Sequence, residues 1–97
     1  MYRFDDTSSA KVFHNSAAQQ FELRVGDLLS LLQYRVVDTK MIIFHTEVPA
    51  AVRNRGLAER MTKAALEFAR SEKLKVEPRC PYTAAFLRRH RGYSDLL

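Results

Sequence analysis

The chain has 97 residues, of which 46% are hydrophobic and 28% are charged, so it can form one small hydrophobic core but not two. Its 16 Lys and Arg residues outnumber its 11 Asp and Glu residues, and the net charge of +5 favours an anionic partner without identifying one. No apolar run reaches the length of a membrane-spanning helix, so we expect no contact with a membrane. A single domain over residues 1–97 is expected.

The first half of the chain predicts an antiparallel meander of about four strands after a polar, patternless segment over residues 1–10. In the second strand, Phe21, Leu23 and Val25 alternate with polar residues, as in a strand with one buried face. The Gly-Asp pair that follows suits a hairpin turn. The next strand is apolar on both faces, which indicates a central place in the sheet. The expected strands are residues 11–14, 19–25, 28–37 and 40–48.

The second half predicts two helices with one strand between them. Leu57, Met61 and Phe68 recur at helical spacing, and Asn54 is a suitable helix cap before them. A strand–helix–strand crossover requires the new strand to run parallel to the strand before the helix. The expected elements are a helix to about Ser71, a strand over residues 74–80 and a second helix from Pro81 to about His90.

The segment between the strand 40–48 and the long helix has the composition of an anion site. It is basic, with Arg53 and Arg55, while Gly56 lets the backbone approach a ligand closely and the small Ala58 keeps that approach open. The first backbone N–H groups of a helix have no intrahelical partner and lie at the positive end of the helix dipole. The expected ligand is a phosphate or a pyrophosphate.

These residues carry a family resemblance. The loop Arg53-x-x-Gly56-x-Ala58 resembles the Arg/Gln-x-x-Gly-x-Gly/Ala signature of GNAT acetyltransferases, whose loop holds the pyrophosphate of acetyl-CoA. The resemblance covers residues 27–97 and is closer still to the small single-domain branch of predicted acetyltransferases. The matching segments are His45-Thr46-Glu47-Val48-Pro49, the loop over residues 53–58, Cys80-Pro81-Tyr82 and Arg88-Arg89-His90-Arg91-Gly92-Tyr93.

The resemblance implies a compact α/β (α+β) fold with a mixed, mostly antiparallel sheet and two helices, and acetyl-CoA as co-substrate. Too few residues separate the early strands for the helix pair that covers the acceptor site in most relatives, so the acceptor side is expected to be open. The pantetheine arm is expected between the two parallel strands. The residues expected to bind the cofactor are Val48, Arg53, Arg55, Gly56, Leu57, Ala58 and, through a CoA phosphate, Arg88.

His45 and Glu47 are the candidate proton relays. Transfer of an acetyl group from a thioester to an amine needs a base for the amine, a donor for the oxyanion and an acid for the departing thiolate. Strict alternation places His45 and Glu47 at the open end of the strand 40–48, on the face of Met41 and Ile43. Alternatively, Glu47 is a solvated strand end and His45 a packed, hydrogen-bonded side chain.

Cys80 is the candidate nucleophile, or a thiol that lines the thioester pocket. It precedes a helix and follows Arg79, and both features would stabilise a thiolate. The alternative is a small apolar residue that faces the core. In ordinary GNAT enzymes a tyrosine of the second helix protonates the leaving thiolate, and matching Gly92-Tyr93 to the family's Gly-Phe pair puts Arg88 there. Because an arginine cannot donate a proton near neutral pH, Tyr82 and Cys80 are the substitute acids.

The sequence therefore predicts an acetyl-CoA-dependent N-acetyltransferase, whose acceptor is a protein lysine, an N-terminus or a small amine. The alternative is a module that binds CoA with little or no catalysis, because the usual tyrosine is missing. An RNA-binding domain is disfavoured. Such a domain exposes aromatic residues between Lys and Arg on a sheet face, whereas the aromatic residues here mostly fall on the apolar face.

No metal is expected, because His90 has no partner at metal-ligand spacing. A single cysteine excludes an internal disulfide, and no basic-then-apolar leader is present, so a reducing, cytoplasmic location is expected. A monomer is the default expectation.

Overall fold

The computed structural model describes Thr7 and residues 10–97, and its strands form one five-stranded sheet in the order β1-β2-β3-β4-β5. The strands are β1 (Val12–Asn15), β2 (Gln20–Val25), β3 (Leu28–Val37), β4 (Lys40–Glu47) and β5 (Lys75–Pro78). The helices are α1 (Leu57–Ser71) and α2 (Pro81–Arg89), with short 3-10 helices η1 (Ala50–Val52) and η2 (Arg91–Leu96). Apart from Thr7 and Ala10, the segment expected to be patternless lies outside the described residues.

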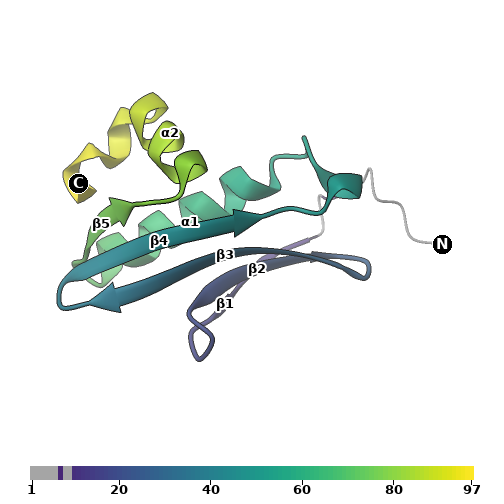
Figure 1. The fold of residues 1–97 in the computed structure, drawn as a ribbon, viewed down its shortest axis with the longest axis horizontal. Helices are drawn as coiled ribbons and strands as arrows, with labels where there is room; N and C mark the ends of the chain where they lie inside the picture. Colours follow the sequence, from purple (N-terminus) through teal and green to yellow (C-terminus); the bar gives the residue numbers. More distant parts are fainter. Residues whose placement is uncertain (1–6, 8–9) are drawn as a thin grey trace.

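The sheet topology confirms the meander and the crossover predicted from the sequence. β1 to β4 pair antiparallel in chain order, and β5 joins β4 in parallel after α1 (Figure 1). β3 is the middle strand, as its two apolar faces indicate. The result is a compact α/β structure with a mixed, mostly antiparallel sheet.

The hydrophobic core lies between α1 and one face of the sheet. Phe21, Leu23 and Val25 of β2 are buried there, as their alternation predicts. Met61 and Leu66 of α1 pack into the same core, since helical spacing brings them to one side of the helix. The opposite face of β1 to β4, which we call the open face, is more exposed: Phe13 of β1 keeps 61% of its surface accessible. No helix in the described part of the chain is long and apolar enough to cross a membrane.

A β-bulge interrupts the pairing of β3 with β4. Gln33 pairs with His45, but the next residue, Tyr34, pairs with Ile43, so Phe44 is an extra residue on β4. Phe44 is 39% exposed. An inserted residue of this kind reverses the faces of every residue after it.

The bulge overturns the predicted placement of the candidate proton relays. Met41 and Ile43 are fully buried on the α1 side, whereas His45 and Glu47 are exposed. The prediction that these four side chains share one face is wrong, because it assumed uninterrupted alternation. Thr46 takes the inward position in their place, where its hydroxyl contacts the thiol of Cys80.

Two element boundaries also differ from the predictions. The cap residue of α1 is Gly56 instead of Asn54; both have a left-handed backbone, and no side chain caps the helix. β5 covers only Lys75–Pro78, because the N–H groups of Arg79 and Cys80 both donate to the carbonyl of Ile43 and end the ladder. α2 begins at Pro81, as predicted.

Candidate active site

The two parallel strands separate at the bulge. The last residue pair between β4 and β5 is Ile43 with Pro78. The N–H groups of Arg79 and Cys80 lie 2.9 and 3.0 Å from the carbonyl oxygen of Ile43, so one acceptor ends the ladder for both. Beyond this point β4 continues to Glu47 without a partner on the β5 side. The strand pair therefore opens in the position that the family resemblance implies for the pantetheine arm.

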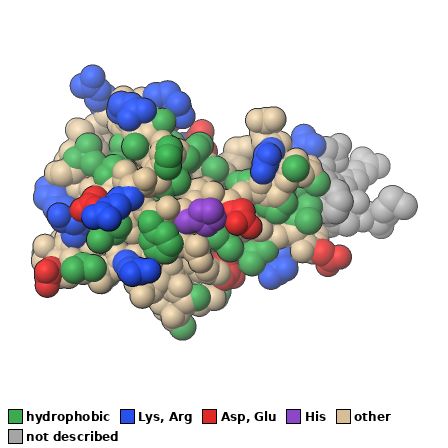
Figure 2. All heavy atoms as spheres, viewed as in Figure 1, with side chains coloured by type: hydrophobic (Ala, Val, Ile, Leu, Met, Phe, Trp, Pro, Cys, Tyr) green, Lys and Arg blue, Asp and Glu red, His purple; other side chains and the backbone are tan. Residues whose placement is uncertain are grey.

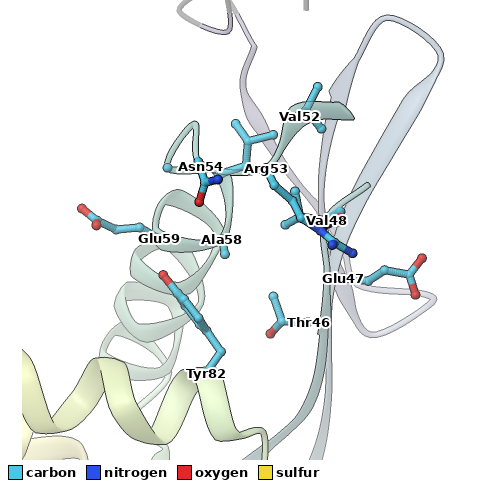
Figure 3. A pocket seen from close by; sticks show the side chains of 11 residues that line it. Thr46, Glu47, Val48, Val52, Arg53, Asn54, Ala58, Glu59 and Tyr82 are labelled. Carbon is cyan, nitrogen blue, oxygen red and sulfur yellow. Dashed lines mark hydrogen bonds between the residues drawn. The ribbon is translucent and has the colours of Figure 1, made fainter. Parts of the chain in front are cut away.

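A cavity of about 460 Å³ lies where the end of β4 meets the start of α1. In Figure 3, Thr46 points into this space, Tyr82 reaches across it from α2 toward Ala58, and Glu47 turns away. The cavity is lined by Thr46, Glu47, Val48, Val52, Arg53, Asn54, Gly56, Leu57, Ala58, Glu59 and Tyr82.

The start of α1 presents unpaired backbone donors to this cavity. The first backbone hydrogen bond of the helix runs from the N–H of Arg60 to the carbonyl of Gly56, 3.1 Å. The N–H groups of Leu57, Ala58 and Glu59 precede it and have no intrahelical acceptor. These donors and the helix dipole together favour an anion.

Glu59 adds a carboxylate to the first turn of α1, but Lys63 offsets its charge. Lys63 Nζ lies 3.0 Å from Glu59 Oε2, one helical turn away. The hydrogen bond from Lys63 lowers the pKa of Glu59, so the pair stays ionised together. The anion-binding character of the helix start is therefore retained.

The structure brings together some of the expected cofactor residues and separates others. Val48, Arg53, Gly56, Leu57 and Ala58 all line the cavity. Arg53 Nε donates to the carbonyl oxygen of Val48 at 3.0 Å and so lies across the end of β4.

Arg55 and Arg88 lie elsewhere. Arg55 is exposed and is not part of the cavity wall. Arg88 lines a second cavity of about 650 Å³ with Leu87 and Arg91, on another side of α2. Figure 2 shows Lys and Arg side chains gathered over this end of the molecule, and Arg88, Arg89 and Arg91 are exposed there.

Cys80 is nearly buried, with 6% of its surface accessible, and its Sγ lies 3.5 Å from Thr46 Oγ1. Burial raises the pKa of Cys80, but its hydrogen bonds with the Thr46 hydroxyl and with the backbone N–H groups of Thr83 and Tyr82 outweigh it, and the net pKa is lowered. Arg79, expected to stabilise the thiolate, forms an ion pair with Glu77 instead. The pKa of Cys80 is therefore lowered by the start of α2 and the Thr46 hydroxyl, and not by Arg79.

His45 and Glu47 are neighbours on the open face, on the other side of β4 from Thr46 and Cys80. His45 Nε2 lies 3.2 Å from Glu47 Oε1, and the two side chains are 47% and 61% exposed. A pair of this kind can accept a proton from a group that approaches from solvent.

Sequence reasoning missed Thr46 as a functional candidate. Strict alternation along β4 would put Thr46 on the face opposite Met41 and Ile43, and only the bulge turns it toward Cys80. Tyr82 was expected as a substitute acid and lines the cavity. Burial and then the charge of Glu59 raise the pKa of Tyr82, so its hydroxyl keeps its proton at neutral pH. Among the described residues, no group of three His, Cys, Asp or Glu side chains could hold a metal ion.

Comparison with known proteins places this arrangement in a family. The family model of GCN5-related N-acetyl-transferases matches residues 20–96. Protein NATD1 of Xenopus tropicalis is 36% identical over 87 residues, which cover 87% of this chain and 80% of that protein. Protein NATD1 of Homo sapiens is 35% identical over 81 residues, which cover 80% and 72%.

A solved structure has the same fold. The NMR solution structure of a GCN5-like protein from Staphylococcus aureus superposes with a TM-score of 0.72 and 25% sequence identity, over 92% of this chain and 88% of that chain. The family generally transfers an acetyl group from acetyl-CoA to an amine, which agrees with an opened strand pair beside the N-terminus of a helix. The chain belongs to the GNAT superfamily of GCN5-related N-acetyltransferases, and it is an acyltransferase.

Proposed function

We propose that the protein acetylates a primary amine with acetyl-CoA bound across the cavity and between β4 and β5. The observation that carries the proposal is the continuity of the two features. The strands part after Ile43 and Pro78, and the opening leads along Thr46 and Val48 to the unpaired N–H groups of α1. An anion can bind at the α1 end of this path, and a thioester can lie at the other end, between β4 and β5.

The pyrophosphate of CoA binds at the start of α1. The N–H groups of Leu57, Ala58 and Glu59 donate to it, and the protonated hydroxyl of Tyr82, which points toward Ala58, adds a side-chain donor (Figure 3). Gly56 leaves this space open, since a Cβ there would meet no atom within 4 Å. These groups support the loop as the cofactor's phosphate site.

The pantetheine arm pairs with the backbone at the end of β4. The carbonyl of Val48 is the expected acceptor, and it already accepts a hydrogen bond from Arg53. Arg53 turns away when the arm binds, and its guanidinium is then free to neutralise a phosphate of CoA. Arg53 therefore has one role in the free protein and another in the complex.

The amine approaches from the open face. On the α1 side, the end of β4 faces the cavity proposed for CoA, whereas His45 and Glu47 are exposed on the other side. The pair takes the proton of the ammonium or of the tetrahedral intermediate. The amine nitrogen attacks the acetyl carbonyl, the C–S bond breaks, and the CoA thiolate takes up a proton from solvent.

A covalent route is the second candidate, because the pKa of Cys80 is lowered. The Cys80 thiolate would attack the acetyl carbonyl first and release the CoA thiolate. The amine would then attack the acetyl-cysteine and restore the Cys80 thiolate. Direct transfer is favoured, since Cys80 is nearly buried and does not line the cavity.

Intact-mass spectrometry after incubation with acetyl-CoA separates the two routes. Direct transfer predicts no acetyl adduct on the wild type and CoA release only when an amine is present. An adduct that is absent from Cys80→Ala and is discharged by amines would establish the covalent route.

A thermal shift on adding CoA tests the cofactor site itself, and no shift would overturn the proposed function.

A further inference from the structure

The register of the sheet aligns Glu47 with one residue on each of three other strands. Glu47 pairs with Leu31, Leu31 with Glu22, and Glu22 with Phe13. Directly paired residues lie on the same face of a sheet, so this row crosses the open face from β4 to β1. Neighbouring strands are about 4.8 Å apart, which puts Glu22 about 10 Å from Glu47.

A second row supports the carboxylate of Glu22. His45, Gln33, Gln20 and Asn15 are paired in sequence across the same four strands. Asn15 Nδ2 donates to Glu22 Oε2 at 3.0 Å, Gln20 Nε2 donates to the same oxygen, and Gln33 Nε2 donates to Gln20 Oε1 at 3.3 Å. The hydrogen bonds from Gln20 and Asn15 lower the pKa of Glu22, so it is ionised at neutral pH.

The other charged residues of the open face leave Glu22 as the carboxylate available to a cation bound beside Glu47. On the far side of the bulge, the guanidinium of Arg35 lies 5.4 Å from the ring centre of Phe44. Glu77 of β5 is already paired with Lys40 and Arg79. Arg24 lies two residues from Glu22 along β2, and no ion pair joins the two among the described residues. A cation beside Glu47 therefore meets its next available carboxylate toward β2.

We propose that the acceptor is an amine with a second positive charge about 10 Å from the reacting nitrogen, and that Glu22 binds this second charge. The inference rests on the proposed function, because it uses the His45–Glu47 pair as the place of reaction. Its ligand chemistry is that of a long diamine or polyamine, or of a lysine near a second basic residue in a peptide. Glu22 is then a specificity-determining residue, and Asn15 and Gln20 position it.

Binding of 1,8-diaminooctane against 8-amino-1-octanol tests the inference without turnover. The two compounds have the same length and differ by one charge. Backbone amide signals of Glu22 and its neighbours, followed by NMR, are expected to report two- to fivefold tighter binding of the diamine, the usual effect of one exposed ion pair. Glu22→Gln is expected to bring the ratio near one. Glu72→Gln, the same change at the far end of α1, is the matched control and keeps the wild-type ratio.

A peptide arm distinguishes the source of the second charge. An extended peptide with two lysines three residues apart is compared with one in which alanine replaces the second lysine. Preference for the doubly charged peptide alone assigns the acceptor to proteins, and preference for the diamine alone assigns it to small polyamines. Equal binding of all singly and doubly charged ligands overturns the inference. If CoA still shifts the melting temperature in that case, the proposed function stands by itself.

Discussion

At the scale of single residues, Gly56 decides how the chain enters α1. Its φ of 76° is in the left-handed region, where a side chain is strained even when there is space for it. Space is available, since an added Cβ would meet no atom within 4 Å. The glycine is therefore favoured by its backbone conformation and not by a lack of space around it.

Gly56→Ala is expected to lower the free energy of unfolding by about 1 kcal/mol. An alanine is strained in the left-handed backbone conformation, although its Cβ meets no other atom. Urea unfolding measures the change. Gly92→Ala is the matched control: its Cβ also enters open space, and its backbone is not left-handed. Equal effects of the two substitutions would contradict the backbone argument.

At the scale of elements, an aromatic cluster joins three strands to α1. The ring of His14 in β1 stacks on Phe21 in β2 at 4.1 Å and meets Phe68 in α1 edge-on at 4.5 Å. Its Nε2 is also hydrogen-bonded to the hydroxyl of Tyr34 in β3. The cluster holds β1, the outer strand, against the rest of the fold.

Stability is expected to fall as the pH falls from about 8 to about 5.5, because burial lowers the pKa of His14 in the folded state. The unfolded chain then binds a proton near the ordinary histidine pKa, while the folded chain binds it only at lower pH, so protonation favours unfolding. The urea midpoint measured across this range shows the effect.

Two variants identify the cause. His14→Phe is expected to flatten the pH dependence of the urea midpoint between pH 8 and 5.5. Tyr34→Phe keeps the burial of His14 and removes its hydrogen bond, so the dependence should persist. Loss of the slope in Tyr34→Phe would show that the hydrogen bond, and not burial, holds the imidazole neutral.

The bulge at Phe44 is the element-scale feature that forms the site. It lies where the pairing of β4 with β5 stops, turns Thr46 toward Cys80 and puts His45 and Glu47 on the open face. A single inserted residue thus separates the thiol from the proposed base. The Cys80 thiol and the His45–Glu47 pair nevertheless both lie next to the end of β4, on its opposite faces.

At the scale of the whole molecule, the net charge of +5 matches a cofactor that carries several phosphate charges. Part of the affinity for CoA should be electrostatic and therefore screened by salt. Between about 0.05 and 0.5 M NaCl we expect the dissociation constant of CoA to rise by on the order of tenfold. Isothermal titration calorimetry measures this dependence.

Pantetheine, which has no phosphate, is the control for this measurement. Its weaker binding should be nearly independent of salt, because it uses only the opening between β4 and β5. A CoA affinity that does not change with salt would mean that backbone donors and packing, and not the basic charge, hold the phosphates.

The sequence by itself determined the order of the elements, the parallel crossover and the place of the basic, glycine-containing loop before α1. These features depend on local periodicity and on residues adjacent in the chain: the alternation in β2, the helical repeat of α1, and a glycine-containing basic loop between strand and helix. Such patterns act over a few residues, so they can be read without knowing the partners.

Only the tertiary structure decided which side chains meet at the proposed reaction centre. The bulge depends on how β4 pairs with β3, the short β5 depends on one shared carbonyl of Ile43, and Arg79 is taken by Glu77. Each of these outcomes depends on contacts between segments far apart in the chain. A one-residue change in register reverses a face, so the location of Thr46, His45 and Glu47 was fixed by pairing across strands and not by any signal within β4.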